Sequence, residues 1–114
     1  MRMLPGALGV LLALVSTQAS AQPAVNLTGT YRCVQLCQSG HVGWPAYVTQ
    51  NGWNINLLNE VDQPSRAWFS WPGRIWAGNW NVGAVYSPDG LTIQFDSGTI
   101  WRRYLGGPVL SRRP

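Results

Sequence analysis

Few residues of this chain have the chemistry that catalysis requires. The 114-residue sequence contains one histidine, His41, and four acidic residues, Glu60, Asp62, Asp89 and Asp96. Asp89 lies in Pro-Asp-Gly and Asp96 precedes Ser-Gly, contexts in which a short carboxylate typically caps its own turn. Hydrolysis requires a positioned acid, base or nucleophile, and His41 has no candidate serine or cysteine partner apart from a pair of cysteines expected to be oxidised. We therefore predict that the protein is not an enzyme.

The two cysteines, Cys33 and Cys37, have a spacing that favours a disulfide. A disulfide requires Cα atoms within about 7 Å, whereas four residues of extended strand span roughly 13 Å. The segment between them must therefore curl, and we expect a bend or bulge there. Cys33, Cys37 and His41 also form an evenly spaced set of metal ligands, but this set lacks a fourth ligand and competes with oxidation. We predict a disulfide, with no metal and no cofactor.

Tryptophan is the outstanding compositional excess, with seven residues at positions 44, 53, 68, 71, 76, 80 and 101. Each ring buries roughly 150–250 Å² and carries an N–H that needs a partner, so tryptophan suits both a core and a half-wet surface. We expect Trp53 and Trp101 to fill the interior. In a strand, Trp68 and Trp71 differ by an odd number of positions, so one ring should point inward and the other outward. Trp76 and Trp80 share a parity, which leaves at least one ring of this group facing away from the core.

Solvent-facing rings beside polar side chains would form an apolar platform with hydrogen-bonding edges. The residues predicted to bind a ligand on this platform are Trp68, Trp71, Trp76, Trp80, Arg66, Arg74 and Asn79. Our leading hypothesis is an exported, non-catalytic binding module that recognises a glycan or a small amphipathic ligand.

Two other functions are compatible with the sequence. An inhibitor of a lytic enzyme or protease would place a loop, 37–45 or 60–65, in the cleft of a secreted protein target. A structural envelope protein would pack its exposed rings against neighbouring subunits.

The first 21 residues have the three-part layout of a secretory signal. Met1-Arg2-Met3 is a short positive start, residues 4–15 are apolar, and Ala19-Ser20-Ala21 is a small-residue cleavage site. The apolar stretch is shorter than the roughly 18–20 residues of a membrane span, so we predict none. We expect a periplasmic or secreted protein with one domain over residues 22–105 and a flexible basic tail over residues 106–114.

The net positive charge of the chain comes largely from its two ends. All eight basic residues are arginines, and three of them, Arg2, Arg112 and Arg113, lie in the signal segment or the tail. The remaining body is nearly neutral. Because a nucleic-acid surface requires clustered basic residues, we predict no nucleic-acid partner.

The body has the pattern of an antiparallel sandwich or barrel. Short runs rich in β-branched and aromatic residues are separated by turn residues, and no stretch keeps a helical period. Asn51-Gly52 is the strongest hairpin signal, because both residues tolerate positive φ. The sequence predicts an all-β fold of seven or eight strands in an up-and-down meander that closes into a barrel. The expected strands are 29–35, 46–50, 53–58, 66–71, 74–78, 83–87, 91–96 and 99–104.

The run from Asn26 to Tyr31, Asn-Leu-Thr-Gly-Thr-Tyr, resembles the start of lipocalin- and avidin-like (calycin-type) barrels. In those barrels a Gly-x-Trp opens the first strand, and an arginine of the last strand packs over the aromatic ring. Tyr31 stands in place of that tryptophan, and the resemblance implies that Arg102 or Arg103 packs over it. The run over residues 93–102 also resembles the end of small exported bacterial proteins of unassigned function, which implies a compartment and a shape but no activity.

Overall fold

The computed structural model of the protein describes residues 23–106 and shows eight strands. The predicted signal segment, residues 1–21, and the predicted tail apart from Gly106 lie outside these residues. No helix long and apolar enough to cross a membrane occurs in residues 23–106. The strands are β1 Gly29–Gln35, β2 Pro45–Asn51, β3 Asn54–Leu58, β4 Pro64–Trp71, β5 Arg74–Ala77, β6 Val82–Tyr86, β7 Thr92–Phe95 and β8 Ile100–Arg103.

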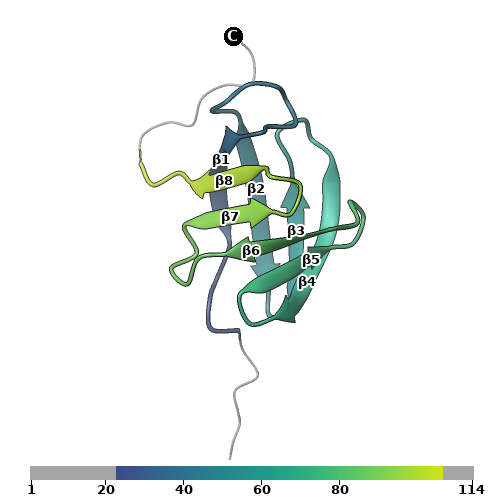
Figure 1. Cartoon of the computed structure of the whole chain (residues 1–114). Helices are drawn as coiled ribbons and strands as arrows, with labels where there is room; N and C mark the ends of the chain where they lie inside the picture. The colour runs from purple at the N-terminus through teal and green to yellow at the C-terminus, as the bar shows by residue number, and fades with distance from the viewer. Residues whose placement is uncertain (1–22, 107–114) are drawn as a thin grey trace, which may run out of the picture.

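The strands form a closed antiparallel barrel in which each strand pairs with the next and β8 returns to β1. In Figure 1, β6, β7 and β8 cross in front of β1, β2 and β3 at a steep angle. Closure pairs the two edges that an open meander would leave exposed. The predicted fold, an all-β up-and-down meander closing into a barrel, is therefore confirmed.

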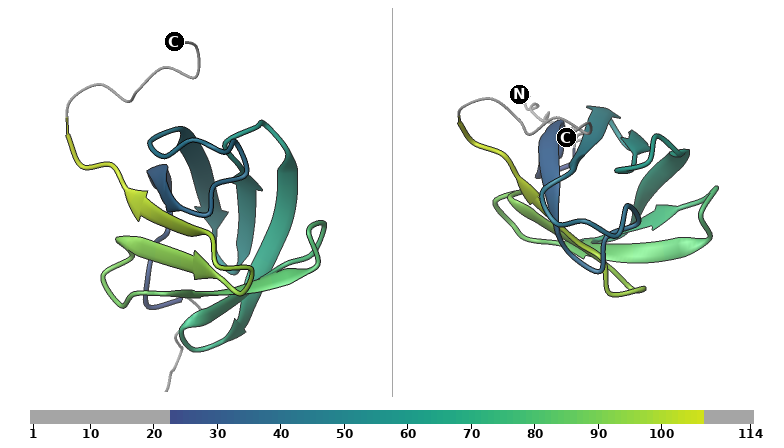
Figure 2. Two further views of the ribbon diagram at one scale, coloured as in Figure 1. Left: turned by 45° about the horizontal axis from the view of Figure 1, so that its top comes forward. Right: turned by 90° about the horizontal axis from the view of Figure 1, so that it is seen from above.

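The connections between strands gather at two ends of the barrel. We call the end with the β1–β2, β3–β4, β5–β6 and β7–β8 connections the upper end. The lower end carries the β2–β3, β4–β5 and β6–β7 connections together with residues 23–28. Figure 2 shows the barrel with its upper end turned toward the viewer.

Alternation along the strands separates the core from the outer surface. In β3, Ile55 and Leu57 are buried, whereas Asn54 and Asn56 are exposed. This is the pattern expected of a strand with one buried face and one solvated face. The largest buried side chains include Trp101 and Tyr31, so the prediction of an interior position for Trp101 is confirmed.

The β2–β3 hairpin differs from the expected one by one residue. Asn51 pairs with Asn54, so the two loop residues are Gly52 and Trp53, and Gly52 has a φ of 64°. A glycine at the first loop position suits a type II′ turn, whereas the expected Asn-Gly loop would have been type I′. Trp53 consequently lies in the turn and is 49% exposed, so the prediction that it fills the interior is wrong.

The first and last strands are joined by Tyr31 and Arg103. The guanidinium carbon of Arg103 lies 5.4 Å from the centroid of the Tyr31 ring, and Nη2 donates to the Tyr31 hydroxyl at 3.0 Å. The same nitrogen donates to the carbonyl of Asn26 at 2.8 Å. Arg102 is exposed on the outer surface. Arg103 is thus the arginine that packs over the aromatic residue of the first strand.

Burial raises the pKa of Tyr31, although the hydrogen bond and charge of Arg103 act in the opposite direction. The folded state therefore holds the phenol proton more tightly than the unfolded chain does. The stability from this difference is present below the unfolded pKa of about 10 and is lost as pH rises through the folded pKa. We expect the free energy of unfolding, measured by urea titration, to fall between about pH 9 and about pH 11 by more in the wild type than in Tyr31→Phe. Equal slopes in the two proteins would contradict this prediction.

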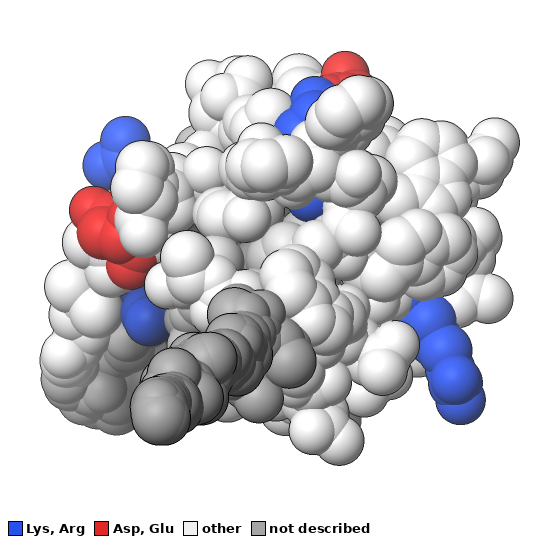
Figure 3. Space-filling model, turned by 90° about the horizontal axis from the view of Figure 1, so that it is seen from below, with Lys and Arg blue, Asp and Glu red and all other residues white. Residues whose placement is uncertain are grey.

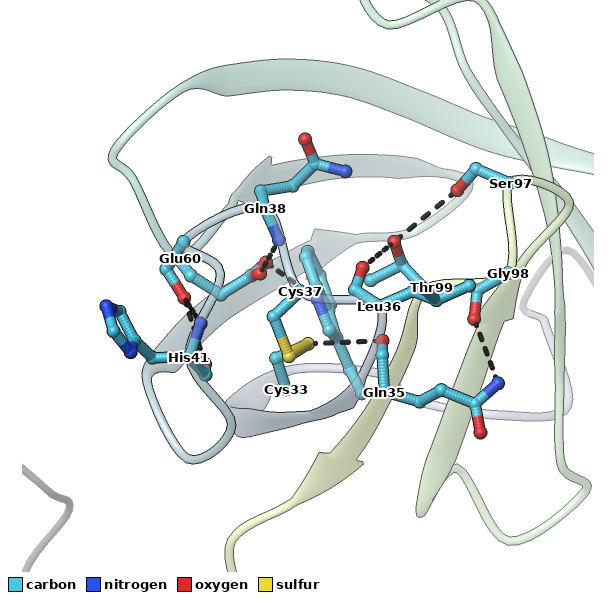
Figure 4. Close-up of a disulfide and its surroundings, with 12 residues drawn as sticks. Cys33, Gln35, Leu36, Cys37, Gln38, His41, Glu60, Ser97, Gly98 and Thr99 are labelled. Atoms are coloured by element: carbon cyan, nitrogen blue, oxygen red, sulfur yellow. Dashed lines mark hydrogen bonds between the residues drawn. A yellow bond between two sulfur atoms is a disulfide. The ribbon is translucent and has the colours of Figure 1, made fainter.

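The Cys33–Cys37 disulfide is present, and the chain curls as predicted. The two Cα atoms are 5.7 Å apart, the β1–β8 register shifts between Cys33 and Gln35, and Leu36 has a φ of 47°. Figure 4 shows Thr99 of the β7–β8 connection beside this loop, and its hydroxyl donates to the Leu36 carbonyl at 2.7 Å. The loop is therefore held both by the disulfide and by a contact with a distant segment.

Removing the disulfide should have a moderate effect, because the closed loop is short. The chain-entropy relation gives about 2 kcal/mol for a loop of this length. We expect the free energy of unfolding of Cys33→Ala/Cys37→Ala, measured in urea, to be lower than that of the wild type by about 2 kcal/mol. A reductant should lower the free energy of unfolding of the wild type by a similar amount. A loss below about 0.5 kcal/mol in both experiments would contradict this prediction, because it would show that the other contacts hold the loop without the disulfide.

Candidate functional site

The barrel has a large apolar groove at its lower end, which we call the lower groove. It has a volume of about 560 Å³ and is lined by residues 23–25, Trp53, residues 69–73, Tyr86 and Pro88. Seen from below, most of the visible surface of this end is uncharged (Figure 3). The volume lies in the range of small-molecule sites, roughly 300–1,000 Å³.

Three aromatic rings form a continuous wall of the lower groove. Trp53 and Phe69 meet edge to face with centroids 5.6 Å apart, and Phe69 meets Tyr86 in the same way at 5.7 Å. The Tyr86 hydroxyl accepts a hydrogen bond from the Gly73 amide at 3.1 Å, which ties β6 to the β4–β5 turn. The wall is therefore built by residues of three hairpins and held by a polar contact at one side.

Trp71 lies at the rim of the lower groove because of a bulge in β4. Phe69 pairs with Ile75 and Trp71 with Arg74, which leaves Ser70 as an extra residue in β4. A bulge of this kind resets the alternation of faces. Trp68 and Trp71 are 45% and 69% exposed, so the prediction that one of the two rings points inward is wrong.

A second, smaller cavity lies at the upper end, and we call it the upper cavity. Its volume is about 270 Å³, and its lining includes the rings of Trp80, Phe95 and Trp101 and the side chain of Glu60. Trp80 follows the end of β5, where strand alternation no longer applies, and its ring packs against Phe95 and Trp101.

Glu60 is buried in the wall of the upper cavity. One carboxylate oxygen accepts from the backbone N–H of Gln38 at 2.7 Å, as Figure 4 shows, and the other accepts from the Trp101 indole N–H at 2.9 Å. A carboxylate oxygen of Glu60 and the two cysteine sulfurs all lie within 4.8 Å of one another.

The structure does not bring together Cys33, Cys37 and His41, the three residues whose spacing would suit metal ligands. The His41 ring instead stacks on Trp44 with centroids 5.4 Å apart, and His41 is exposed. The two sulfurs are joined to each other in the disulfide and are therefore not thiolate ligands.

The seven residues predicted to bind a ligand are divided among different places. Trp71 lies at the lower groove and Trp80 in the upper cavity. Trp68 and Trp76 are register neighbours on the outer surface of β4 and β5, close to Arg66. The other two make structural contacts: the Asn79 side-chain oxygen accepts from the Arg66 amide at 2.8 Å, and Arg74 forms a 2.7 Å ion pair with Asp96.

Sequence reasoning missed Phe69 and Tyr86 as groove residues and Glu60 as a cavity residue. Phe69 shares the inward parity of Ala67, so an aromatic residue near the end of a strand at an inward position was the available signal. The sequence carried no comparable signal for the burial of Glu60.

Comparison of the chain with protein-family models, with curated proteins and with solved structures found no match. The eight-stranded antiparallel barrel is compatible with the calycin-type resemblance at the level of shape.

Proposed function

We propose that the protein is a non-catalytic binding module that holds a small amphipathic ligand in the lower groove. The observation that carries the proposal is the groove of about 560 Å³ walled by the rings of Trp53, Phe69 and Tyr86. Aromatic walls remove apolar ligand surface from water, which stabilises a complex by about 0.8 kcal/mol per buried CH₂. The Ser70 side chain and the backbone of the β4–β5 turn supply polar groups for a head group at the rim.

The same rings favour an amphipathic ligand over a glycan. Sugar recognition needs an exposed ring face with several hydrogen-bonding side chains around it, whereas the groove lining is dominated by aromatic, proline and aliphatic residues. Trp68 beside Arg66 on the outer surface is the better candidate for stacking on a sugar.

Export is part of the proposal. The layout of residues 1–21 supports it, and the disulfide is of a kind that persists in oxidising compartments. The packing of Arg103 over Tyr31 supports a calycin-type origin for the barrel.

The test uses the protein without residues 1–21 and three uncharged probes. Calorimetric titration with octyl glucoside below its micelle concentration should give binding, whereas methyl glucoside should bind at least about 100-fold more weakly because it lacks the buried chain. Chitin- and cellulose-derived oligosaccharides test the glycan alternative. Binding of the oligosaccharides without binding of octyl glucoside would contradict the proposal.

A matched pair of variants locates the site. Trp71→Ala should weaken octyl glucoside binding about tenfold to 100-fold, because a ring at the groove rim no longer covers the ligand. Trp68→Ala removes another exposed ring of the same strand, from the outer surface, and should leave the affinity unchanged. Equal losses in the two variants would place the ligand elsewhere.

An inhibitor of a lytic enzyme or protease is a second candidate. The β1–β2 connection is anchored by the disulfide and exposes Val42 at 69%, an apolar side chain available to a target cleft. Inhibition of lysozymes or secreted proteases that Val42→Asp abolishes would support this function. A lack of inhibition across such a panel would reject it.

A further inference from the structure

We propose that the outer surface of β3, β4 and β5 binds an acidic sugar, such as a uronic acid of a polysaccharide. We call this surface the outer platform, and its residues are Asn54, Asn56, Arg66, Trp68 and Trp76. The platform lies on the outer wall of the barrel, whereas the lower groove lies at one end. The proposal therefore does not depend on the ligand of the lower groove.

Strand register brings the residues of the outer platform together. Trp68 pairs with Trp76 on one side and with Asn54 on the other, and Arg66 pairs with Asn56. Side chains directly opposite each other on antiparallel strands have Cβ atoms about 4.5–5.5 Å apart. In β4, Arg66 and Trp68 are exposed and the residue between them is buried, so both side chains point away from the core. An indole ring and a guanidinium are thus presented to solvent side by side.

Gly78 leaves room for the ring of Trp68. A Cβ atom added at Gly78 would lie 2.8 and 2.9 Å from two carbons of that ring, which is too close for a real contact. The φ of Gly78 is not positive, so the backbone itself does not require glycine here. The indole therefore lies against the chain just after β5, and it is still 45% exposed. A ring held in this way loses little conformational freedom when a ligand stacks on it.

The charge of the outer platform favours an acidic sugar over a neutral one. Arg74 and Asp96 form a 2.7 Å ion pair that lies over Gly83, the register partner of Trp76. Because these two charges cancel, the exposed Arg66 gives the platform its net positive charge. A guanidinium binds a carboxylate through two parallel charge-assisted hydrogen bonds.

The neutral side chains of the outer platform favour a sugar over a simple anion. A pyranose has a face of C–H groups, which can stack on the apolar area of an exposed indole, and a rim of hydroxyl groups. Asn54 and Asn56 are exposed in β3, and each side-chain amide both donates and accepts hydrogen bonds. One indole face, two amides and one guanidinium therefore match the C–H face, the hydroxyls and the carboxylate of a uronic acid.

The decisive experiment compares trigalacturonic acid with its methyl ester by calorimetric titration of the protein without residues 1–21. The ester keeps the rings and hydroxyls of the sugar but has no charge. We expect the acid to bind at least about tenfold more tightly, because only a carboxylate forms charge-assisted hydrogen bonds with Arg66. Equal affinity for the two probes, or no binding of the acid at millimolar concentration, would overturn the proposal.

A pair of arginine variants assigns the charge. Arg66→Gln should bind the acid and the ester with nearly equal affinity, because the guanidinium that distinguishes them is gone. Arg102→Gln removes an exposed arginine of β8 and should keep the preference of the wild type for the acid. An unchanged preference in Arg66→Gln would exclude pairing with Arg66 and overturn the proposal.

A pair of tryptophan variants assigns the ring. Trp68→Ala should weaken binding of trigalacturonic acid about tenfold, whereas Trp71→Ala at the lower groove should leave it unchanged. Octyl glucoside has no carboxylate and trigalacturonic acid has no alkyl chain, so a failure of the lower groove to bind is distinguishable from a failure of the outer platform. Equal affinity for the acid in Trp68→Ala and in the wild type would overturn the proposal.

Discussion

Replacement of Trp101 by alanine is expected to lower the free energy of unfolding by about 3–5 kcal/mol. The ring is 1% exposed and packs against Phe95, Trp80 and Tyr31 with centroid distances of 4.8, 6.2 and 6.4 Å. Its removal leaves a cavity that the closed barrel has little freedom to fill. It also removes the donor that the Glu60 carboxylate accepts from at 2.9 Å. Urea unfolding monitored by far-UV circular dichroism measures the loss.

Two further variants separate packing from hydrogen bonding at Trp101. Trp101→Phe keeps much of the apolar volume but has no N–H, so its loss should be smaller than that of Trp101→Ala. Trp68→Ala removes a ring that is 45% exposed on the outer surface, and it should cost about 1 kcal/mol or less. A loss for Trp101→Ala no greater than that for Trp68→Ala would contradict the central position of Trp101 in the core.

Replacement of Arg103 by alanine is expected to lower the free energy of unfolding by about 2–3 kcal/mol. Its Nη2 atom donates to the Asn26 carbonyl at 2.8 Å and to the Tyr31 hydroxyl at 3.0 Å, and the guanidinium lies over the Tyr31 ring. Together these contacts connect β8, β1 and the segment before β1. Removal of the guanidinium should therefore weaken the pairing of β1 with β8, which closes the barrel.

Arg102 provides the matched control for Arg103, because it is the preceding residue of β8 and is exposed. Arg102→Ala should change the free energy of unfolding by less than about 0.5 kcal/mol. Arg103→Lys keeps the charge but loses the fork of donors, so an intermediate loss is expected. Similar losses of free energy of unfolding in Arg102→Ala and Arg103→Ala would show that the pairing of β1 with β8 does not depend on the Arg103 guanidinium.

The strands of the barrel were predictable because their burial follows a period of two residues. The range predicted for the first strand, 29–35, is the range of β1, and in β3 the alternation of Ile55 and Leu57 with Asn54 and Asn56 matches the observed burial. Each of these segments buries one face and solvates the other, so the pattern of apolar residues is sufficient to place the strand.

The positions of Trp53 and Trp71 were not predictable in the same way. Trp53 depends on which two residues form the β2–β3 turn, and Trp71 depends on the extra residue in β4. The extra residue in β4 changes the register by one residue, which moves a side chain to the other face, whereas the displaced β2–β3 turn takes Trp53 out of the strand. Alternation of apolar residues does not contain that information, so the positions of Trp53 and Trp71 at the lower groove appeared only in the structure.

The burial of Glu60 depends on contacts between segments far apart in the sequence. Its carboxylate accepts from Gln38 in the β1–β2 connection and from Trp101 in β8, which are 22 and 41 residues away. A polar loop around Glu60 gives no indication of these partners. The upper cavity could therefore not be inferred from local sequence pattern.

The indole N–H resonances of the seven tryptophans give the most direct test of the proposed function. In a protein labelled with ¹⁵N-tryptophan, octyl glucoside should shift the resonances of Trp53 and Trp71, which line the lower groove, and should leave Trp68 and Trp76 on the outer surface unchanged. Shifts confined to Trp68 and Trp76, or no shift at any indole at saturating concentration, would contradict ligand binding in the lower groove.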